Sequence, residues 1–312
     1  MEASVGRDFR YTRADFVKIR ELIYQHAGIM LADAKQPLVY SRLSRRLREL
    51  NLKQFSDYIA LLRPGEPEWQ AFTNALTTNL TSFFREQYHF PILAEHAQKI
   101  QRRPIRLWSA ASSTGEEPYS MAMTMIDAFD SFTPPVRILA SDLDTNVLET
   151  ARRGVYPVDR VEKIPLDMKR RFFRRGTGSN TGLARVSPEL QALIDFRQIN
   201  LLDAEWDIDC KFDAIFCRNV MIYFDKETQR KLIGKFLRVM QPDGLLFTGH
   251  SESFFHVSDL IVPIGKTVYR AGSRKRIESQ DELAKRDDLA RRDDLARRAD
   301  LKAREDSGMR DG

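Results

Sequence analysis

The feature that most constrains the fold is an alternation of strand-like and helix-like segments that begins after Pro104. Five apolar runs have the length and composition of buried strands: IRLWSAA, VRILASDLD, IDFRQINLL, FDAIFCRNV and GLLFTGHSE. Helical stretches lie between them, and the last, KETQRKLIGKFLRVM, is expected to end at Pro242-Asp243-Gly244. Alternating strands and helices form parallel sheets through right-handed crossovers. The sequence therefore predicts an α/β fold with a doubly wound, mostly parallel sheet.

The segment before this alternation has the pattern of a small helical bundle. In DFVKIRELIYQHAGI, apolar residues recur at helical spacing from Phe16 to Ile29. A second helix is expected in PLVYSRLSRRLREL, with Pro37 in its first turn. A chain of 312 residues has room for a small domain beside one of catalytic size. We therefore expect a helical N-terminal domain over residues 1–90 and the larger α/β domain over residues 91–272.

Two further segments depart from these patterns. The connection between the second and third predicted strands, residues 154–190, is unusually long and contains FFRRGTGSNTGLARV. We interpret it as a small inserted β-subdomain, because insertions of this kind commonly serve a partner or substrate. Residues 273–312 repeat a leucine every six residues and hold twelve bases and eleven acids. A six-residue period makes no single helical stripe, so this tail is expected to be disordered or a charge-laced helix without a chemical role.

Basic residues gather in two places, although the net charge is only +6. Residues 31–53 carry six Lys or Arg against two acids, and residues 152–185 carry ten against three. Such patches indicate an acidic partner, such as nucleic acid, an anionic membrane surface or an acidic protein. A solvated basic face is the alternative for either patch alone. The arginines of the first patch that share one helix are Arg42, Arg45, Arg46 and Arg48.

Several classes of protein do not fit the sequence. The longest uncharged window, residues 69–84, is too short and too polar to span a bilayer, and no secretory signal precedes the first charged residues. The two cysteines, Cys210 and Cys217, lack a CxxC spacing and a nearby histidine cluster. A disulfide framework and a metal site are therefore not expected, and reduced thiols in a cytoplasmic protein are the plain interpretation.

Polar residues interrupt the apolar runs where the predicted strands end. In FDAIFCRNVMIYFD a guanidinium and an amide, Arg218 and Asn219, follow an otherwise buried strand. Glu117 follows the first strand, Asp142 ends the second, and Asn200 ends the third. In doubly wound sheets, ligands bind outside the carboxyl ends of the strands near the point where strand order reverses. These residues therefore predict a ligand pocket at that edge of the sheet.

The turn after the first strand favours one kind of cofactor. Dinucleotide folds need G-x-G-x-x-G for backbone to approach a pyrophosphate, whereas SAASSTGEEPYS holds only Gly115 and two glutamates. Helix N-termini attract anions, and Glu117 would repel a phosphate there. S-adenosylmethionine lacks phosphate and offers a ribose, an ammonium and a sulfonium, and Asp142 could accept both ribose hydroxyls. Taken singly, Asp142 could be a helix N-cap and Glu117 a first-turn acid that complements the helix dipole.

The motifs TTNLTSFFRE, WSAASSTGEEPYS, ASDLD, INLLD, FDAIFCRNVMIYFD, PDGLLFTGHSE and KTVYR together resemble the chemotaxis receptor glutamate methyltransferases, the CheR family. The resemblance extends from about residue 10 to residue 271. It implies a helical N-terminal domain joined to a methyltransferase sheet that carries a small β-subdomain. It also implies transfer of a methyl group from S-adenosylmethionine, with S-adenosylhomocysteine as product, to glutamate side chains of the cytoplasmic domain of a methyl-accepting chemoreceptor.

The resemblance further implies site residues. Arg85 and Tyr223 correspond to residues nearest the transferring methyl group. Cofactor contacts are implied for Asn79, Thr81, Arg85, Glu117, Asp142, Asn200, Leu201, Arg218 and Asn219. Three alternatives stay open: TTNLTSFF could be an amphipathic helix that packs its apolar side chains between the domains, Tyr223 could be a core aromatic, and Arg218 could pair with Asp213 or Glu117.

The two basic segments gain a candidate partner from the same resemblance. Receptor signalling domains are long acidic helical bundles, along which the Arg42–Arg48 helix could lie. The insertion resembles the family's β-subdomain, which in some members docks a tethering peptide from the receptor's C-terminus; its expected contacts are Arg174, Arg175, Gly176 and Gly178. Nucleic acid is not expected as partner, because NVMIY lacks the two prolines of the base-gripping motif of amino-group methylases. A non-catalytic receptor-binding scaffold is the rival from another class.

Overall fold

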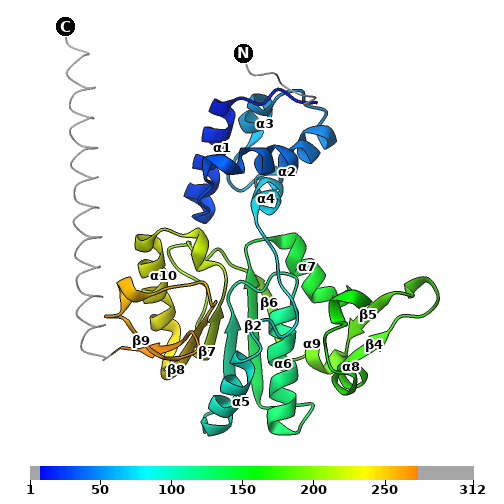
Figure 1. Ribbon diagram of the computed structural model, residues 1–312, viewed down its shortest axis with the longest axis vertical. Coiled ribbons are helices and arrows are strands. Elements are labelled where there is room, and N and C mark those ends of the chain that lie inside the picture. Colours follow the sequence, from blue (N-terminus) through cyan, green and yellow to red (C-terminus); the bar gives the residue numbers. More distant parts are fainter. Residues whose placement is uncertain (1–7, 273–312) are drawn as a thin grey trace.

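The computed structural model describes residues 8–272, and the predicted disorder or helicity of the 273–312 tail lies outside them. A helical domain lies over one end of a sheet domain, and a small β-subdomain projects from the side of the sheet domain (Figure 1). The helical domain contains α1 (Arg13–Ala27), η1 (Asp33–Lys35), α2 (Gln36–Glu49), α3 (Phe55–Leu61) and α4 (Pro67–Leu76). This arrangement confirms the predicted combination of a helical N-terminal domain and an α/β domain.

Apolar residues at helical spacing build the core of the helical domain. Phe16, Ile19 and Ile23 on α1 are at most 1% exposed, as their spacing predicts. The Thr12 side chain accepts the Asp15 backbone N–H, and the Asp15 carboxylate accepts the Thr12 N–H, which forms a capping box that starts α1. This core ends with Leu76 on α4. The change from one core to the next therefore comes earlier than residue 90.

The sheet has seven strands in the order β6-β2-β1-β7-β8-β10-β9. Its strands are β1 (Ile105–Ser109), β2 (Val136–Asp142), β6 (Ile194–Gln198), β7 (Phe212–Cys217), β8 (Met240–Thr248), β9 (Ile261–Gly265) and β10 (Val268–Ala271). The five predicted strands are parallel neighbours, and β10 pairs antiparallel with β8 and β9. Strand order reverses between β1 and β7. Their carboxyl ends therefore flank the ligand position that the sequence predicts.

Helices cover both faces of this sheet. They are α5 (His89–Lys99), α6 (Glu116–Phe129), α7 (Thr145–Arg153), α9 (Pro188–Gln191) and α10 (Lys226–Val239). The end of α10 differs from the prediction, because the helix stops at Val239 and Pro242-Asp243-Gly244 lies inside β8. The register between β7 and β8 shifts between Phe212 and Ala214, which accommodates these extra residues as an irregularity in the ladder.

The two final strands, β9 and β10, were not predicted from the sequence. β9 reads IVPIG, and its residues after Ile261 are exposed, so it lacks the apolar run of a buried strand. Proline is confined to edge strands because it cannot donate to a ladder, and β9 is the edge of this sheet. Antiparallel pairing of β10 with β8, and of β9 with β10, places these strands in the sheet, rather than their own composition.

The predicted insertion is a three-stranded antiparallel sheet in the order β3-β5-β4. Its elements are β3 (Val155–Pro157), η2 (Val158–Val161), α8 (Leu166–Phe172), β4 (Phe173–Arg175), η3 (Gly178–Asn180) and β5 (Leu183–Val186). The Tyr156 hydroxyl donates to the Thr114 carbonyl at 2.7 Å, and Arg160 pairs with the buried Glu116. The subdomain is thus anchored to the turn that follows β1.

A non-helical segment, residues 77–88, joins the two domains, and we call it the strap. The alternative of an amphipathic helix in TTNLTSFF is wrong, since the strap contains only irregular residues and turns, and Leu80 is 77% exposed. Phe83 is buried and packs edge-on against Tyr156 and Phe173 at ring-centre distances of 5.1 and 5.4 Å. The apolar anchoring of the strap on the sheet domain thus comes from single aromatic side chains rather than from a helix face.

No helix among residues 8–272 combines the length and the apolar character that crossing a bilayer requires.

Candidate functional site

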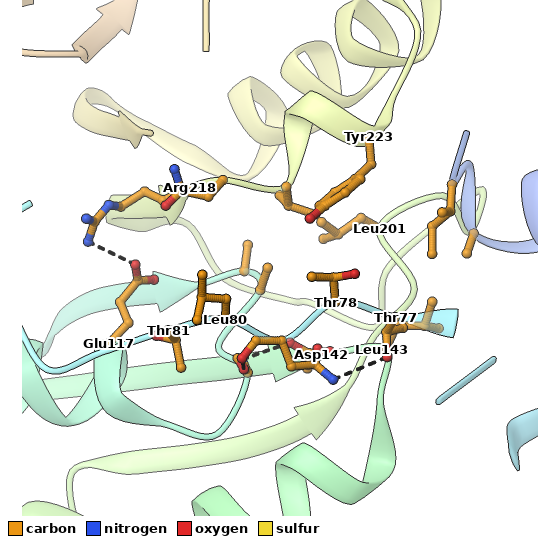
Figure 2. A pocket seen from close by; sticks show the side chains of 18 of the residues that line it. Thr77, Thr78, Leu80, Thr81, Glu117, Asp142, Leu143, Leu201, Arg218 and Tyr223 are labelled. Atoms are coloured by element: carbon orange, nitrogen blue, oxygen red, sulfur yellow. Dashed lines mark hydrogen bonds and ion pairs between the residues drawn. The ribbon is translucent and has the colours of Figure 1, made fainter. Parts of the chain in front are cut away.

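One pocket lies where the predicted strand ends meet. Its volume is about 1010 Å³ including the solvent at its mouth, within the range of sites that hold small ligands. Every predicted cofactor and catalytic residue lines it: Asn79, Thr81, Arg85, Glu117, Asp142, Asn200, Leu201, Arg218, Asn219 and Tyr223. In Figure 2, Arg218 and Tyr223 lie on one side, and Leu80, Thr81, Glu117 and Asp142 lie on the other. The sequence thus identifies residues that the fold brings to a single cavity.

Asp142, at the end of β2, presents a carboxylate to this pocket. Its Oδ2 accepts the Ser113 N–H at 2.8 Å, and its Oδ1 accepts the Asp144 N–H at 3.0 Å. Burial raises the pKa of Asp142 to about 6, against the lowering effect of these two N–H donors. Asp142 itself is no helix N-cap, because Asp144 accepts the first N–H groups of α7. A carboxylate fixed in this way can still accept hydroxyl groups through its remaining lone pairs.

Arg218 lines the pocket at the end of β7, and its side chain is only 2% exposed. Its guanidinium pairs with Glu117 at 3.1 Å and with Glu86 at 3.3 Å, and it also donates to the Arg85 carbonyl. The predicted pairing with Glu117 is therefore confirmed, and Asp213 pairs instead with Arg102. Two acids share one base here, which leaves a net negative charge beside the pocket.

Glu117 is held at the start of α6. Its Oε1 accepts the Ser109 hydroxyl at 2.7 Å, while its Oε2 faces Arg218. Burial raises the pKa of Glu117, against the lowering effect of Arg218 and Ser109. Gly115, with φ of +96°, forms the turn before it, and a Cβ there would approach Ala151 and the Tyr156 hydroxyl within 3 Å. The tight turn therefore brings the Glu117 carboxylate to the pocket, where a dinucleotide-binding fold would have a glycine-rich phosphate loop.

The strap presents Arg85 in a strained turn. Phe84 and Glu86, on either side of it, both have φ of +52°, a left-handed conformation that non-glycine residues seldom adopt. The Phe84 N–H is fixed by the Ser120 hydroxyl at 2.9 Å, and the Arg85 guanidinium donates to the Leu80 carbonyl at 2.8 Å. The surrounding contacts thus hold the Arg85 side chain at the wall of the pocket while it stays partly exposed.

The first part of the strap is tied to the α/β domain. Asn79 Nδ2 and the Thr77 hydroxyl each donate to Asp144 Oδ2, at 2.8 and 2.7 Å, and the Asn79 carbonyl accepts the Ser113 hydroxyl at 3.0 Å. The Asn79 amide therefore faces Asp144 rather than the open pocket. Asn79 therefore presents its backbone to the pocket, and its side chain fixes the orientation of the strap.

Asn200, Leu201 and Tyr223 complete the wall opposite the strap. Asn200 Nδ2 donates to the His26 carbonyl at 2.8 Å, which links the third strand end to the helical domain. Leu201 is buried and offers an apolar surface. Tyr223, on η4 (Met221–Tyr223), is only partly buried, and its backbone carbonyl accepts the Met30 N–H at 3.3 Å. The side chain points into the pocket (Figure 2), so Tyr223 is not a core aromatic.

The predicted partner-binding arginines divide into two groups. Arg45 and Arg48 are well exposed, with side chains 83% and 61% accessible. Arg46 pairs with Glu68 at 2.6 Å, and Arg42 donates to the Leu76 and Thr77 carbonyls at 3.0 and 2.6 Å. Arg42 therefore caps the end of α4 and fixes the start of the strap, and Arg42 and Arg46 are committed within the domain.

Arg42→Ala is expected to lower the affinity for the cofactor several-fold and to reduce stability by about 1–3 kcal/mol, because two carbonyls lose a charged donor. Arg45→Ala, on the same helix, is the matched control and should change neither quantity. Titration calorimetry and thermal unfolding measure both. If both variants had the cofactor affinity and the stability of the wild type, Arg42 would have no structural role at the end of α4 and would count among the arginines available to a partner.

In the β-subdomain, Arg174 and Arg175 are exposed on β4, which is an edge strand. The turn after them needs its glycines: Gly178 has φ of +58°, and a Cβ on Gly176 would collide with Asn180. None of these four residues lines the pocket.

Some residues of the pocket were not predicted. Ala27 and Ile29, beside the end of α1, form an apolar wall contributed by the helical domain. Ile29 was expected only on a helix face, and the sequence carries no signal that α1 reaches the strand ends. Glu86, which lies beside the pocket and pairs with Arg218, was also missed, although it follows Arg85 directly in the quoted motif. Its importance depends on Arg218, which is distant in sequence.

The pocket fits a cation with a ribose better than a phosphate-bearing ligand. Asp142 and the Glu117–Arg218–Glu86 group give it negative character, and the turn before α6 places two glutamates at the helix N-terminus. Apolar side chains of Leu76, Leu201 and Phe224 line it as well. This donor set suits the ammonium, sulfonium and ribose of S-adenosylmethionine.

Comparison with known proteins agrees with this chemistry. Residues 79–270 match the family described as CheR methyltransferase, SAM binding domain, and residues 14–77 match CheR methyltransferase, all-alpha domain. The chain is 57% identical over 266 residues to chemotaxis protein methyltransferase 2 of Pseudomonas aeruginosa, which covers 85% of this chain and 95% of that relative. It is 50% identical over 258 residues to the chemotaxis protein methyltransferase of Escherichia coli, which covers 82% and 90%.

Fold, pocket and comparisons define an S-adenosylmethionine-dependent methyltransferase. More narrowly, the chain belongs to the CheR family of chemotaxis methyltransferases.

Proposed function

We propose that this enzyme transfers the methyl group to glutamate carboxylates on the cytoplasmic domain of a chemoreceptor, which yields glutamate methyl esters, and that it acts in the cytoplasm. The observation that carries the proposal is the placement of a partly exposed guanidinium, Arg85, and a tyrosine, Tyr223, on the wall of one acid-lined pocket. A cation at that position suits an acceptor that is itself an anion. The relatives named as chemotaxis protein methyltransferases support a role in chemotaxis.

A carboxylate acceptor places few chemical demands on the protein. A glutamate side chain has a pKa of about 4.3, so it is already ionised near neutral pH and needs no general base. S-adenosylmethionine supplies a methyl group on a sulfonium, which is already activated for displacement. What remains is to orient the acceptor and to remove water from it.

The residues of the pocket can perform these tasks. Arg85 can hold the acceptor carboxylate through its guanidinium and leave a lone pair on one oxygen free for attack. Its contact is positional, because tight pairing with both oxygens would weaken the nucleophile. The Tyr223 hydroxyl can orient the same group. Asp142 can accept ribose hydroxyls, while Leu201 and the apolar wall of the helical domain exclude water.

The receptor contact is proposed for two surfaces. Arg45 and Arg48 expose positive charge on α2, which would attract an acidic helical bundle in a salt-sensitive manner. On the β-subdomain, the free edge of β4 with Arg174 and Arg175 could pair with an extended tethering peptide from the receptor's C-terminus. Such docking would raise the local concentration of the acceptor glutamates.

A comparison of acceptors tests the function. The enzyme is incubated with tritiated S-adenosylmethionine and one of three acceptors: a receptor cytoplasmic fragment, the same fragment with its acceptor glutamates replaced by alanine, or mixed RNA and DNA. We expect label only in the unaltered fragment. Label in nucleic acid would favour a nucleic-acid methyltransferase, and absence of transfer with intact binding of the fragment would favour a scaffold.

A further inference from the structure

A buried carboxylate outside the pocket lies directly behind the loop that carries three of the site residues. Glu252 follows β8 and is only 6% exposed. Its Oε1 accepts the Met221 N–H at 2.9 Å, and its Oε2 accepts the Gly249 N–H at 2.5 Å. The backbone N–H of Asn219 also bonds to it. One side chain thus receives three backbone donors from the loops 218–223 and 249–252.

The two loops approach each other closely. Asn219 has φ of +58°, a left-handed conformation that is uncommon for residues other than glycine, although asparagine adopts it more often than most. A Cβ on Gly249 would collide with the side-chain amide of Asn219 and come within 2.9 Å of its backbone nitrogen, so this contact needs a glycine. Surrounding contacts hold the loops together at this point, and the Glu252 carboxylate supplies one to each loop.

A second carboxylate, Glu86 on the strap, ties the other side of the same two loops. Its Oε1 accepts His250 Nδ1 at 2.9 Å and lies 3.4 Å from Asn219 Nδ2, while its Oε2 lies 3.3 Å from Arg218. Glu86 contacts these side chains and also accepts the His250 backbone N–H at 3.3 Å, whereas the contacts of Glu252 are to backbone N–H groups. Together they connect the strap that carries Arg85 with the loop that carries Tyr223.

We propose that Glu252 is a positioning residue for methyl transfer, whose ionised carboxylate holds the loop with Arg218, Asn219 and Tyr223 in its reactive shape. The inference rests on the proposed function of this site. A neutral carboxyl group has a hydroxyl in place of one acceptor oxygen, so it can no longer accept all three backbone N–H groups well. Protonation of Glu252 would therefore loosen the loop without touching the cofactor or the acceptor.

The surroundings of Glu252 bring its protonation into the pH range in which the enzyme can be assayed. Burial raises its pKa to about 7, although the N–H groups of Gly249, Asn219 and Met221 oppose the shift, and the charge of Glu86 on the strap adds to it. Two other titratable groups face it: the Cys217 thiol on β7, whose pKa is raised well above its usual value by burial, and the Tyr269 hydroxyl on β10, whose pKa is also raised by burial. Both stay neutral between pH 5 and pH 8, so Glu252 carries the titration.

The sign of the effect on stability follows from this shift. The folded-state pKa of Glu252 lies above the ordinary value of 4.5, so the folded protein retains the proton that the unfolded chain releases. The contribution of Glu252 to stability therefore falls as pH rises from about 4.5 to about 7 and is constant above. The melting temperature of Glu252→Gln relative to wild type is expected to rise over the same interval.

The test uses the Glu252→Gln variant, which keeps the shape of the side chain and removes the ionisation. In the ligand-free protein, we expect the Met221 and Gly249 amides to lose hydrogen-exchange protection. In methyl transfer to a receptor fragment, kcat at pH 8 should fall about 100-fold with a smaller change in cofactor affinity, as expected for a misplaced reactive loop. Wild-type kcat should fall about tenfold per pH unit below 7, whereas the variant should be nearly independent of pH.

Two variants serve as controls. Asp213→Asn alters another buried carboxylate that accepts a backbone N–H, from Arg106 at 2.8 Å, but at the opposite end of the strands. It should lower stability and leave the pH profile of kcat as it is. His250→Asn removes the imidazole beside Glu86 and should keep the inflection near pH 7.

The outcomes separate the two levels of the proposal. A Glu252→Gln enzyme with wild-type kcat, pH profile and amide protection would overturn the positioning role. Absence of transfer to receptor glutamates by the wild type would overturn the proposed function, while the hydrogen-exchange comparison would still decide whether Glu252 holds the loop.

Discussion

Arg85→Ala is expected to retain the fold and the affinity for S-adenosylmethionine within a few-fold, and to lose at least about 100-fold in methyl transfer, since misplacement of a reacting group has effects of this size. The Arg85 side chain is partly exposed, and its hydrogen bond within the protein goes to the Leu80 carbonyl on its own strap. Its removal therefore creates no buried unpaired charge. Steady-state kinetics with a receptor fragment, beside calorimetry with the cofactor, measures the two quantities separately.

Arg63→Ala provides the control for loss of an arginine that bonds only to nearby carbonyls, those of Ala60 and Leu62. It lies outside the pocket and should turn over at the wild-type rate. Wild-type turnover in the Arg85 variant as well would remove Arg85 from the acceptor site. Arg85→Lys should recover only part of the activity, because an ammonium lacks the planar, paired donors of a guanidinium.

Asp142→Ala is expected to weaken binding of S-adenosylmethionine about 10- to 100-fold, because each hydrogen bond to a charged group contributes roughly 1.5–3 kcal/mol. The same carboxylate predicts a pH dependence. Its pKa in the free protein is raised to about 6 by burial, and only the ionised form accepts both ribose hydroxyls. Wild-type affinity should therefore be constant above pH 7 and fall as pH drops through 6.

Calorimetry between pH 5 and pH 8 tests this dependence, with Asp195→Ala as a control on an exposed strand residue that pairs with Arg197. The Asp142 variant should bind weakly at every pH, without the inflection. Unchanged affinity in Asp142→Ala would contradict the argument from strand ends, since this carboxylate is its clearest member.

The strand-end residues could be predicted because they follow from local rules. A buried apolar run that meets a polar residue marks where a strand leaves the core, and the carboxyl ends of parallel strands share one edge. Asp142, Asn200 and Asn219 are predicted in this way. The five parallel strands are predictable because each is an apolar run between helical segments, although β6 lies at the edge of the sheet and is partly exposed.

Other features depend on packing between distant segments and leave no local signal. Arg218 stands at a strand end in the sequence, but its burial depends on Glu86 and Glu117, which converge on it from the strap and from α6 and offset part of the cost of removing its charge from water. Arg42 reads as one more arginine of a basic helix, but its position opposite the end of α4 makes it a cap. Leu80 reads as part of an apolar helix face, whereas strained turns after it leave the side chain exposed.

The product bond tests the central claim most directly. After transfer of tritiated methyl to a receptor fragment, the labelled protein is treated with mild alkali, and volatile methanol is counted. A carboxyl methyl ester predicts near-complete release for the wild-type enzyme and almost no label with Arg85→Ala. Label that resists alkali would mean methylation of nitrogen and would contradict a carboxylate acceptor in this pocket.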